Sequence, residues 1–201
     1  MSLYPPQPWN LTADARVSVW RVPPSQLPAL PDGVSPLLVA GQASVFTAWI
    51  DYTPPGQLSY HELLAAVSIK ARRVSCTITE IWVDSEASLA GGRELWAIPK
   101  DLAALDFTGG RTFTATAATA DDWIATAAFT RRAGLPLRLP TSFEVVQERD
   151  GLLRTPVGAK ISPRPASADW SFNPEGPLGY LAGRRPVASL ELPSSTLRFG
   201  A

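Results

Sequence analysis

Apolar and polar residues alternate with a period of two in several segments of the chain, the pattern of strands with one buried face. In residues 73–84, for example, Val74, Cys76 and Ile78 fall on one face, and serine and threonine occupy the other. The segments that show this pattern or are rich in strand-forming residues are 15–22, 44–52, 73–84, 111–119, 122–131 and 185–192. The pattern therefore predicts a mainly β protein.

Turn residues join some of these segments into hairpins. Ala120-Asp121 separates segments 111–119 and 122–131, and Asp150-Gly151 is the strongest short hairpin signal in the chain. Residues 61–70 are compatible with either helix or strand, and strand is favoured because a sheet continues on both sides. These connections predict a mostly antiparallel sheet.

The predicted helices are short because 20 prolines, about twice the average usage, are spread along the chain. Residues 25–30 follow a Ser25 N-cap, residues 85–92 end in a glycine stop, and residues 99–105 begin with Pro99 in the first turn. No linker divides the chain, so residues 1–201 are expected to form one domain. Residues 162–179 are expected to be loop-rich, with Trp170 and Phe172 packed on the body.

Composition narrows the class of function. A chain of 201 residues with 45% apolar content can bury a full core without a metal or disulfide. Eighteen basic residues balance 18 acidic ones, so nucleic acid and anionic membranes are poor candidate partners. With Cys76 and His61 as the only cysteine and histidine, Cys/His metal centres and most hydrolase triads lack residues. No signal or membrane-spanning segment is seen, which favours the cytoplasm, and a homo-oligomer is the common expectation.

The chain has three lysines, and Lys100 differs from the other two. Lys70 and Lys160 lie in polar surroundings, whereas Lys100 lies in the apolar segment ELWAIPKDLAAL. Burial disfavours the ammonium form, and a neutral amine is what attack on a ketone or aldehyde requires. Lowering the pKa of the amine to about 7 requires the site to disfavour the ammonium form by about 4 to 5 kcal/mol. Desolvation and the positive end of a helix that begins at Pro99 would both act in this direction. The Asp101 carboxylate would act in the opposite direction if it were close. The alternative is a lysine whose amine reaches the surface from an apolar segment.

Residues 82–103, WVDSEASLAGGRELWAIPKDLA, resemble the signature of the acetoacetate decarboxylase family, with Gly92-Arg93-Glu94 followed by Pro99-Lys100. Segments 4–9, 17–33 and 59–62 resemble other parts of the same superfamily. The resemblance implies an antiparallel, cone-like β-barrel with an internal site and no metal or organic cofactor. It also implies that Lys100 forms an imine with a keto acid, and that Glu62 and Arg21 lie in the pocket. Acetoacetate decarboxylase is itself a standard example of an activated lysine.

Two positions depart from the family pattern. Asp101 stands where the decarboxylases have a second lysine, and an acid expected about 15 residues before the tyrosine-x-glutamate falls near Thr47. The imine could therefore serve decarboxylation, or an aldol, retro-aldol or dehydration reaction. A non-catalytic barrel that binds a small molecule is the alternative.

The sequence thus predicts a Schiff-base lyase for a small β-keto acid or related carbonyl compound. Lys100 is the expected nucleophile, Glu62 a proton-transfer or orienting group, and Arg21 an anchor for a substrate carboxylate. Trp82 and Trp96 are expected to form a wall of the pocket, although buried aromatic residues more often belong to a core. His61 would point away from Glu62 on a strand, which favours a structural role. Arg93 and Glu94 are expected to form an internal ion pair or to have an architectural role.

Overall fold

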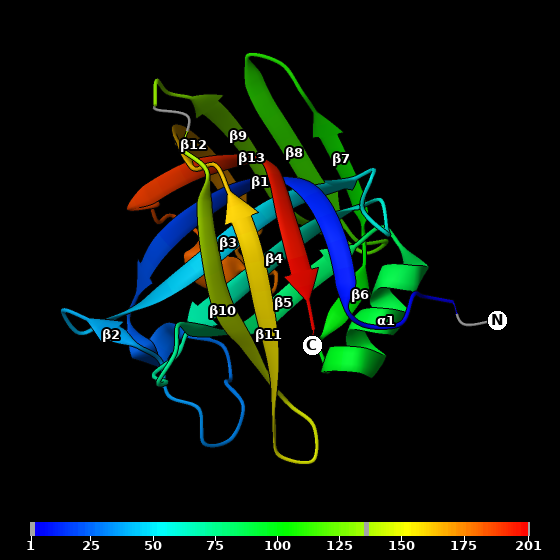
Figure 1. The fold of residues 1–201 in the computed structure, drawn as a ribbon. Coiled ribbons are helices and arrows are strands. Elements are labelled where there is room, and N and C mark those ends of the chain that lie inside the picture. Colours follow the sequence, from blue (N-terminus) through cyan, green and yellow to red (C-terminus); the bar gives the residue numbers. More distant parts are fainter. Residues whose placement is uncertain (1–2, 135–136, 201) are drawn as a thin grey trace.

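The protein is a closed β-barrel with a second sheet folded against its outer surface (Figure 1). The computed structural model describes residues 3–134 and 137–200. The seven barrel strands, in spatial order, are β1 (Trp9–Val22), β3 (Gln42–Thr53), β4 (Tyr60–Ser68), β5 (Ser75–Val83), β10 (Leu139–Glu148), β11 (Leu152–Ile161) and β13 (Ala188–Phe199). Pairing of β1 with β13 closes the ring.

The flanking sheet branches from the first half of β13. It consists, in spatial order, of β12 (Arg164–Phe172), β9 (Trp123–Arg131), β8 (Thr112–Ala118) and β7 (Ala104–Thr108). The short strands β2 (Leu38–Val39) and β6 (Lys100–Leu102) pair with β3 and β5. One helix, α1 (Glu86–Trp96), and two single turns, η1 (Pro24–Gln26) and η2 (Gly179–Leu181), complete the elements described.

The predicted strands and hairpins are confirmed. Residues 61–70 contain strand β4, the hairpin of β8 and β9 surrounds Ala120-Asp121, and Asp150-Gly151 joins β10 to β11. The sheet is antiparallel except for two short parallel pairings, β5 with β6 and β5 with β10. The loop-rich prediction for residues 162–179 is wrong in part because it contains β12, but Trp170 and Phe172 do pack on the body.

All three predicted helices differ from the structure. Of residues 25–30, only Ser25 and Gln26 lie in a helical element, the single turn η1, and Ser25 is inside this turn rather than its N-cap. Residues 99–105 form strands β6 and β7, because Lys100 and its neighbours pair alongside β5. Helix α1 continues through Gly91 and Gly92 and ends at Ala97, which adopts the left-handed conformation with φ 54°. The glycines are not a stop signal. A Cβ atom on Gly91 would lie 2.4 Å from the Trp9 ring, and one on Gly92 would lie 2.7 Å from Lys100 Cδ.

Alternation along the barrel strands produces two apolar cores. The inner core lies inside the barrel and below α1, and its larger members are Trp9, Leu11, Ile50, Ile81, Trp96, Val145 and Val157. The outer core lies between the barrel and the flanking sheet, and its larger members are Trp20, Trp49, Leu63, Trp82, Phe113, Phe129 and Phe172. On β4, Leu63 faces the outer core while Glu62 and Leu64 face the barrel interior. The inner core is hollow, and its cavity contains the candidate site.

Candidate active site

The barrel encloses a cavity of about 350 Å³ with a mostly apolar lining. Among the described residues that line it, Lys100 is the one cation and Glu62 the one acid. Both are buried, with 4% of Lys100 and 2% of Glu62 exposed. The predicted burial of Lys100 is therefore confirmed, and the alternative of an amine that reaches the surface is wrong.

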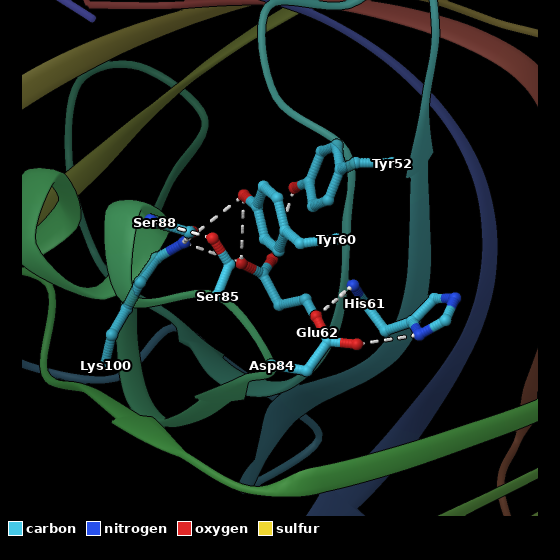
Figure 2. A network of polar contacts seen from close by, with 8 residues as sticks. All are labelled: Tyr52, Tyr60, His61, Glu62, Asp84, Ser85, Ser88 and Lys100. Atoms are coloured by element: carbon cyan, nitrogen blue, oxygen red, sulfur yellow. Dashed lines mark hydrogen bonds and ion pairs between the residues drawn. The ribbon is translucent and has the colours of Figure 1, made fainter. Parts of the chain in front are cut away.

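The Lys100 amine is held by a compact polar network (Figure 2). Its Nζ lies 2.8 Å from Glu62 Oε2, donates to Ser88 Oγ at 2.8 Å and lies 3.4 Å from the Tyr60 hydroxyl. Tyr52 donates to the other Glu62 oxygen, Oε1, at 3.2 Å. The amine and its acid are therefore within the distance at which a proton can pass between them.

Local sequence explains how these groups meet. Tyr60 and Glu62 are two residues apart on β4, so both side chains enter the barrel. Ser85 caps α1 by accepting from the Ser88 backbone N–H at 3.2 Å, which fixes the first turn and directs Ser88 toward the amine. Gly92 leaves room for the Lys100 side chain against the helix.

The charge state of Lys100 differs from the prediction. Burial acts to lower the pKa of the amine, but the Glu62 carboxylate and the Tyr60 hydroxyl raise it by more, so the pKa lies above its ordinary value. The resting amine is thus an ammonium paired with a carboxylate rather than the expected neutral base. Burial also raises the pKa of Tyr60 to about 12, so this hydroxyl remains protonated and can donate.

The neighbours of Lys100 in the sequence do not act on the amine. Asp101 is exposed and points away from the cavity, as expected for the next residue on a strand. Its carboxylate lies 3.8 Å from Arg93, which also donates to the Lys100 carbonyl at 2.6 Å. Glu94 instead accepts from Tyr4 at 2.5 Å. The predicted Arg93–Glu94 pair is therefore replaced by a link from Arg93 to strand β6.

Two of the predicted pocket residues lie elsewhere. Arg21 is on the cavity side of β1, where it donates to Ser44, but it pairs six residues beyond the level of Glu62. At about 3.3 Å per residue it is about 20 Å from the ion pair, too far to hold the carboxylate of a small keto acid. Trp82 packs in the outer core with Trp49, because it alternates with the inward Ile81.

Other sequence-based expectations agree with the structure. Trp96 lines the cavity and donates to Gln7 Oε1 at 3.1 Å. His61 points out of the barrel, where its Nδ1 lies 2.9 Å from Asp84 (Figure 2). Lys70 and Lys160 are exposed.

The position where the expected second acid is missing, Thr47, does not face the site. Its hydroxyl accepts from Trp20 at 2.9 Å in the outer core, so an acid there would lie outside the cavity. The group that contacts Glu62 from β3 is instead Tyr52, which sequence reasoning missed together with Tyr60 and Ser88. The spacing Tyr60-x-Glu62 was a usable signal for Tyr60, whereas Tyr52 and Ser88 require the pairing of β3 with β4 and the position of α1.

Residues 1–164 match the family model described as acetoacetate decarboxylase. The chain belongs to this family. Acetoacetate decarboxylase from Legionella pneumophila is similar in structure, with a TM-score of 0.77 and 18% identity over 100% of this chain and 88% of that one. An acetoacetate decarboxylase-like enzyme from Sphingomonas wittichii RW1 has a TM-score of 0.71 and 18% identity over 99% and 92% of the two chains.

A third similar structure is the enduracididine biosynthesis enzyme MppR complexed with pyruvate. Its TM-score is 0.67, with 18% identity over 98% of this chain and 89% of that one. No curated protein matches the chain by sequence. At this identity the likeness establishes the fold, and the decarboxylase-type barrel predicted from the motif around Lys100 is confirmed. Within residues 3–134 and 137–200, no helix is long and apolar enough to cross a membrane.

Proposed function

We propose that this protein is an imine-forming lyase in which Lys100 attacks the carbonyl group of a keto acid. The observation that carries the proposal is the 2.8 Å contact between the Lys100 amine and the Glu62 carboxylate inside an apolar cavity. A lysine nucleophile needs a neutral amine, and an acid in direct contact can accept its proton. Family membership supports the same chemistry.

The first step transfers a proton from the Lys100 ammonium to Glu62. The neutral amine then adds to the substrate carbonyl carbon, and Glu62 returns the proton to the carbinolamine oxygen, which leaves as water. Ketone and ammonium thus give iminium and water without a net change in protons. Apolar surroundings favour the first step, because the pair exchanges two buried charges for two neutral groups.

For a 3-oxo acid, the iminium accepts the electron pair of the bond to the carboxylate as CO2 departs. The products are CO2 and an enamine, which takes a proton at carbon, and hydrolysis then frees the amine. The apolar lining assists this step, because a carboxylate is costly there and CO2 carries no charge. Aldol, retro-aldol or dehydration reactions would use the same iminium with a different substrate.

Each surrounding residue has a distinct role in this proposal. Tyr52 orients Glu62 through Oε1, and Tyr60 and Ser88 hold the amine. Trp96 forms a wall beside the site, as expected for an aromatic lining residue. The residues present supply the reaction with its nucleophile and its proton carrier. The predicted cytoplasmic location and homo-oligomeric state remain predictions from the sequence.

Borohydride trapping tests the proposal. Acetoacetate or pyruvate followed by borohydride should leave a stable adduct, and peptide mass mapping should place it on Lys100. Exposed Lys70 and Lys160 act as internal controls, because they should carry little or no adduct. The Lys100→Arg variant should lose the adduct while keeping a cation beside Glu62. Labelling that is equal on all three lysines, or absent throughout, would overturn the proposal.

A binding barrel without catalysis is the second candidate, favoured by the raised pKa of Lys100 next to Glu62. An amine that remains an ammonium cannot attack a carbonyl group. Release of CO2 from 3-oxo acids distinguishes the two candidates, because saturable ligand binding with neither CO2 release nor a trapped adduct would identify a binding protein.

A further inference from the structure

The cavity is elongated along the barrel strands. On β4, every inward residue from one end of the strand to the other lines it, in the order Tyr60, Glu62, Leu64, Ala66 and Ser68. A volume of about 350 Å³ is therefore distributed along a tunnel rather than gathered around the amine. Acetoacetate, with seven non-hydrogen atoms, would occupy only about 210 Å³ of this space at about 30 Å³ per atom.

One end of the tunnel is closed and the other reaches the surface. At the Lys100 end, α1 and the N-terminal segment cover the barrel (Figure 1), and Trp9 and Trp96 are almost fully buried. At the other end, two lining residues are exposed, Thr141 and Val74, the latter by 75%. A ligand that enters at the open end can bring its carbonyl group to Lys100 only if the carbonyl end enters first.

The strand register gives the distance between the two ends. Lys100 pairs with Ile81 on β5, and Val74 lies seven residues earlier on the same chain. At about 3.3 Å per residue, the opening is about 23 Å from the level at which Lys100 pairs with β5. An extended chain gains about 3.3 to 3.6 Å for every three covalent bonds, so a linear molecule would need about 20 bonds to span this length.

The volume sets a smaller limit on ligand size than the length does. A water molecule occupies about 30 Å³ of liquid, so the cavity has room for about a dozen non-hydrogen atoms. The walls between the two ends are apolar and include Leu64, Ala66, Ile78 and Val145. Such a surface binds methylene groups and offers few partners to a polar chain.

We propose that the carbonyl substrate carries an unbranched alkyl tail of about six to nine carbons, which extends from Lys100 along the tunnel toward Val74. This inference rests on the proposed function, because it places the substrate carbonyl at Lys100. The substrate class is then medium-chain 3-oxo acids or the corresponding methyl ketones. Because Arg21 is too far from Lys100 to bind the substrate carboxylate, the tail supplies the binding energy instead.

Binding of methyl ketones of increasing length tests the tail separately from the imine. The double variant Lys100→Met/Glu62→Gln cannot form an imine and leaves no buried charge unpaired. Its affinity for 2-butanone, 2-heptanone and 2-undecanone is measured by the fluorescence of Trp9 and Trp96, which line the cavity. The affinity should rise about fourfold for each added methylene until the tunnel is full. Affinity that does not change with chain length would overturn the proposal.

A variant that narrows the tunnel midway along its length gives the second test. Ala66→Phe should lower the ratio of 2-undecanone to 2-butanone affinity at least tenfold, because the added ring occupies the path of the tail. Ile78→Phe narrows the same level from β5, where Ile78 pairs with Ala66, and serves if Ala66→Phe does not fold. An unchanged ratio in a folded variant would place the tail elsewhere and overturn the proposal.

The outcomes separate this proposal from the imine chemistry. Length-dependent binding without borohydride trapping in the natural protein would retain the tail site and overturn the proposed reaction. Trapping of short and long ketones at Lys100 with equal affinity would retain the reaction and overturn the tail site.

Discussion

The inner and outer cores are built from the same strands but differ in how they are filled. On β4, Leu63, Ala65 and Val67 are fully buried in the outer core, and the residues between them line the tunnel. Trp20, Trp170 and Phe172 pack at centroid distances of 5.1 to 5.9 Å in the outer core. The outer core thus provides the tight packing that stabilises the fold, and the barrel interior can remain hollow.

The two sides of the barrel wall also hold a glutamate in different ways. Glu62 in the inner core pairs with the Lys100 ammonium. Glu80 faces the outer core, where Tyr180 donates to it at 3.3 Å and Thr79 at 2.5 Å. Burial raises the pKa of Glu80 to about 7, more than those two hydrogen bonds lower it. One glutamate is therefore paired with a cation, whereas the other has only hydroxyl donors and a raised pKa.

The largest expected effect comes from separating the ion pair. Lys100→Met leaves Glu62 charged and unpaired in the barrel, which should lower the free energy of unfolding by about 3 to 5 kcal/mol. Urea denaturation at pH 7 measures this loss. Adding Glu62→Gln should recover most of it, since no charge is then buried. A double variant as unstable as the single one would show that the pair does not account for the loss.

Gly92 tests how closely the helix positions the amine. A Cβ atom there would lie 2.7 Å from Lys100 Cδ and 2.8 Å from Cε, so Gly92→Ala must displace the lysine side chain. Displacement of a catalytic group by about 1 Å can cost about 100-fold in rate. The rate of imine trapping should fall on this scale while thermal stability changes little, because the displaced atoms belong to a flexible side chain. Unchanged trapping would show that the amine tolerates the shift.

Adjacent leucines on β4 compare the two cores directly. Leu63→Ala opens a new cavity in the outer core and should cost about 3 to 5 kcal/mol. Leu64→Ala enlarges an existing cavity and should cost about 1 to 2 kcal/mol, close to the transfer term alone. The two variants match in residue type, strand and number of atoms removed. Equal losses in urea denaturation would contradict the distinction between a packed and a hollow core.

The smallest expected effect concerns pH. The folded pKa of Glu80, about 7, exceeds the unfolded value near 4.5, so the folded state binds more protons between these values and loses stability as pH rises through them. Glu80→Gln should remove this loss and raise the free energy of unfolding at pH 8 by about 1 to 2 kcal/mol. Denaturation at pH 5 gives the control, where the variant and the natural protein should be similar. A gain that is as large at pH 5 would have another cause.

Local sequence predicted the strands, hairpins and reactive lysine because these depend on alternation, turn residues and a short motif. It could not give the height of a residue in the barrel, which depends on pairing between distant strands. Arg21 therefore lies on the expected face of β1 but six residues along the barrel from the level of Glu62. Tyr52 contacts Glu62 only because of the register between β3 and β4. The sequence indicates a helix stop at Gly91 and Gly92, because it does not show that these glycines make room for Trp9 and Lys100, which lie outside the helix.

The seam that closes the barrel has a kinetic consequence. Trp9 on β1 pairs with Phe199 on β13, about 190 residues away along the chain. Contacts between such distant segments form slowly, because the intervening chain must lose its freedom before the contact is made. Until β1 pairs with β13, the apolar inner wall is exposed to water and to other partly folded molecules. The yield of folded protein should therefore depend on the rate at which β1 and β13 pair.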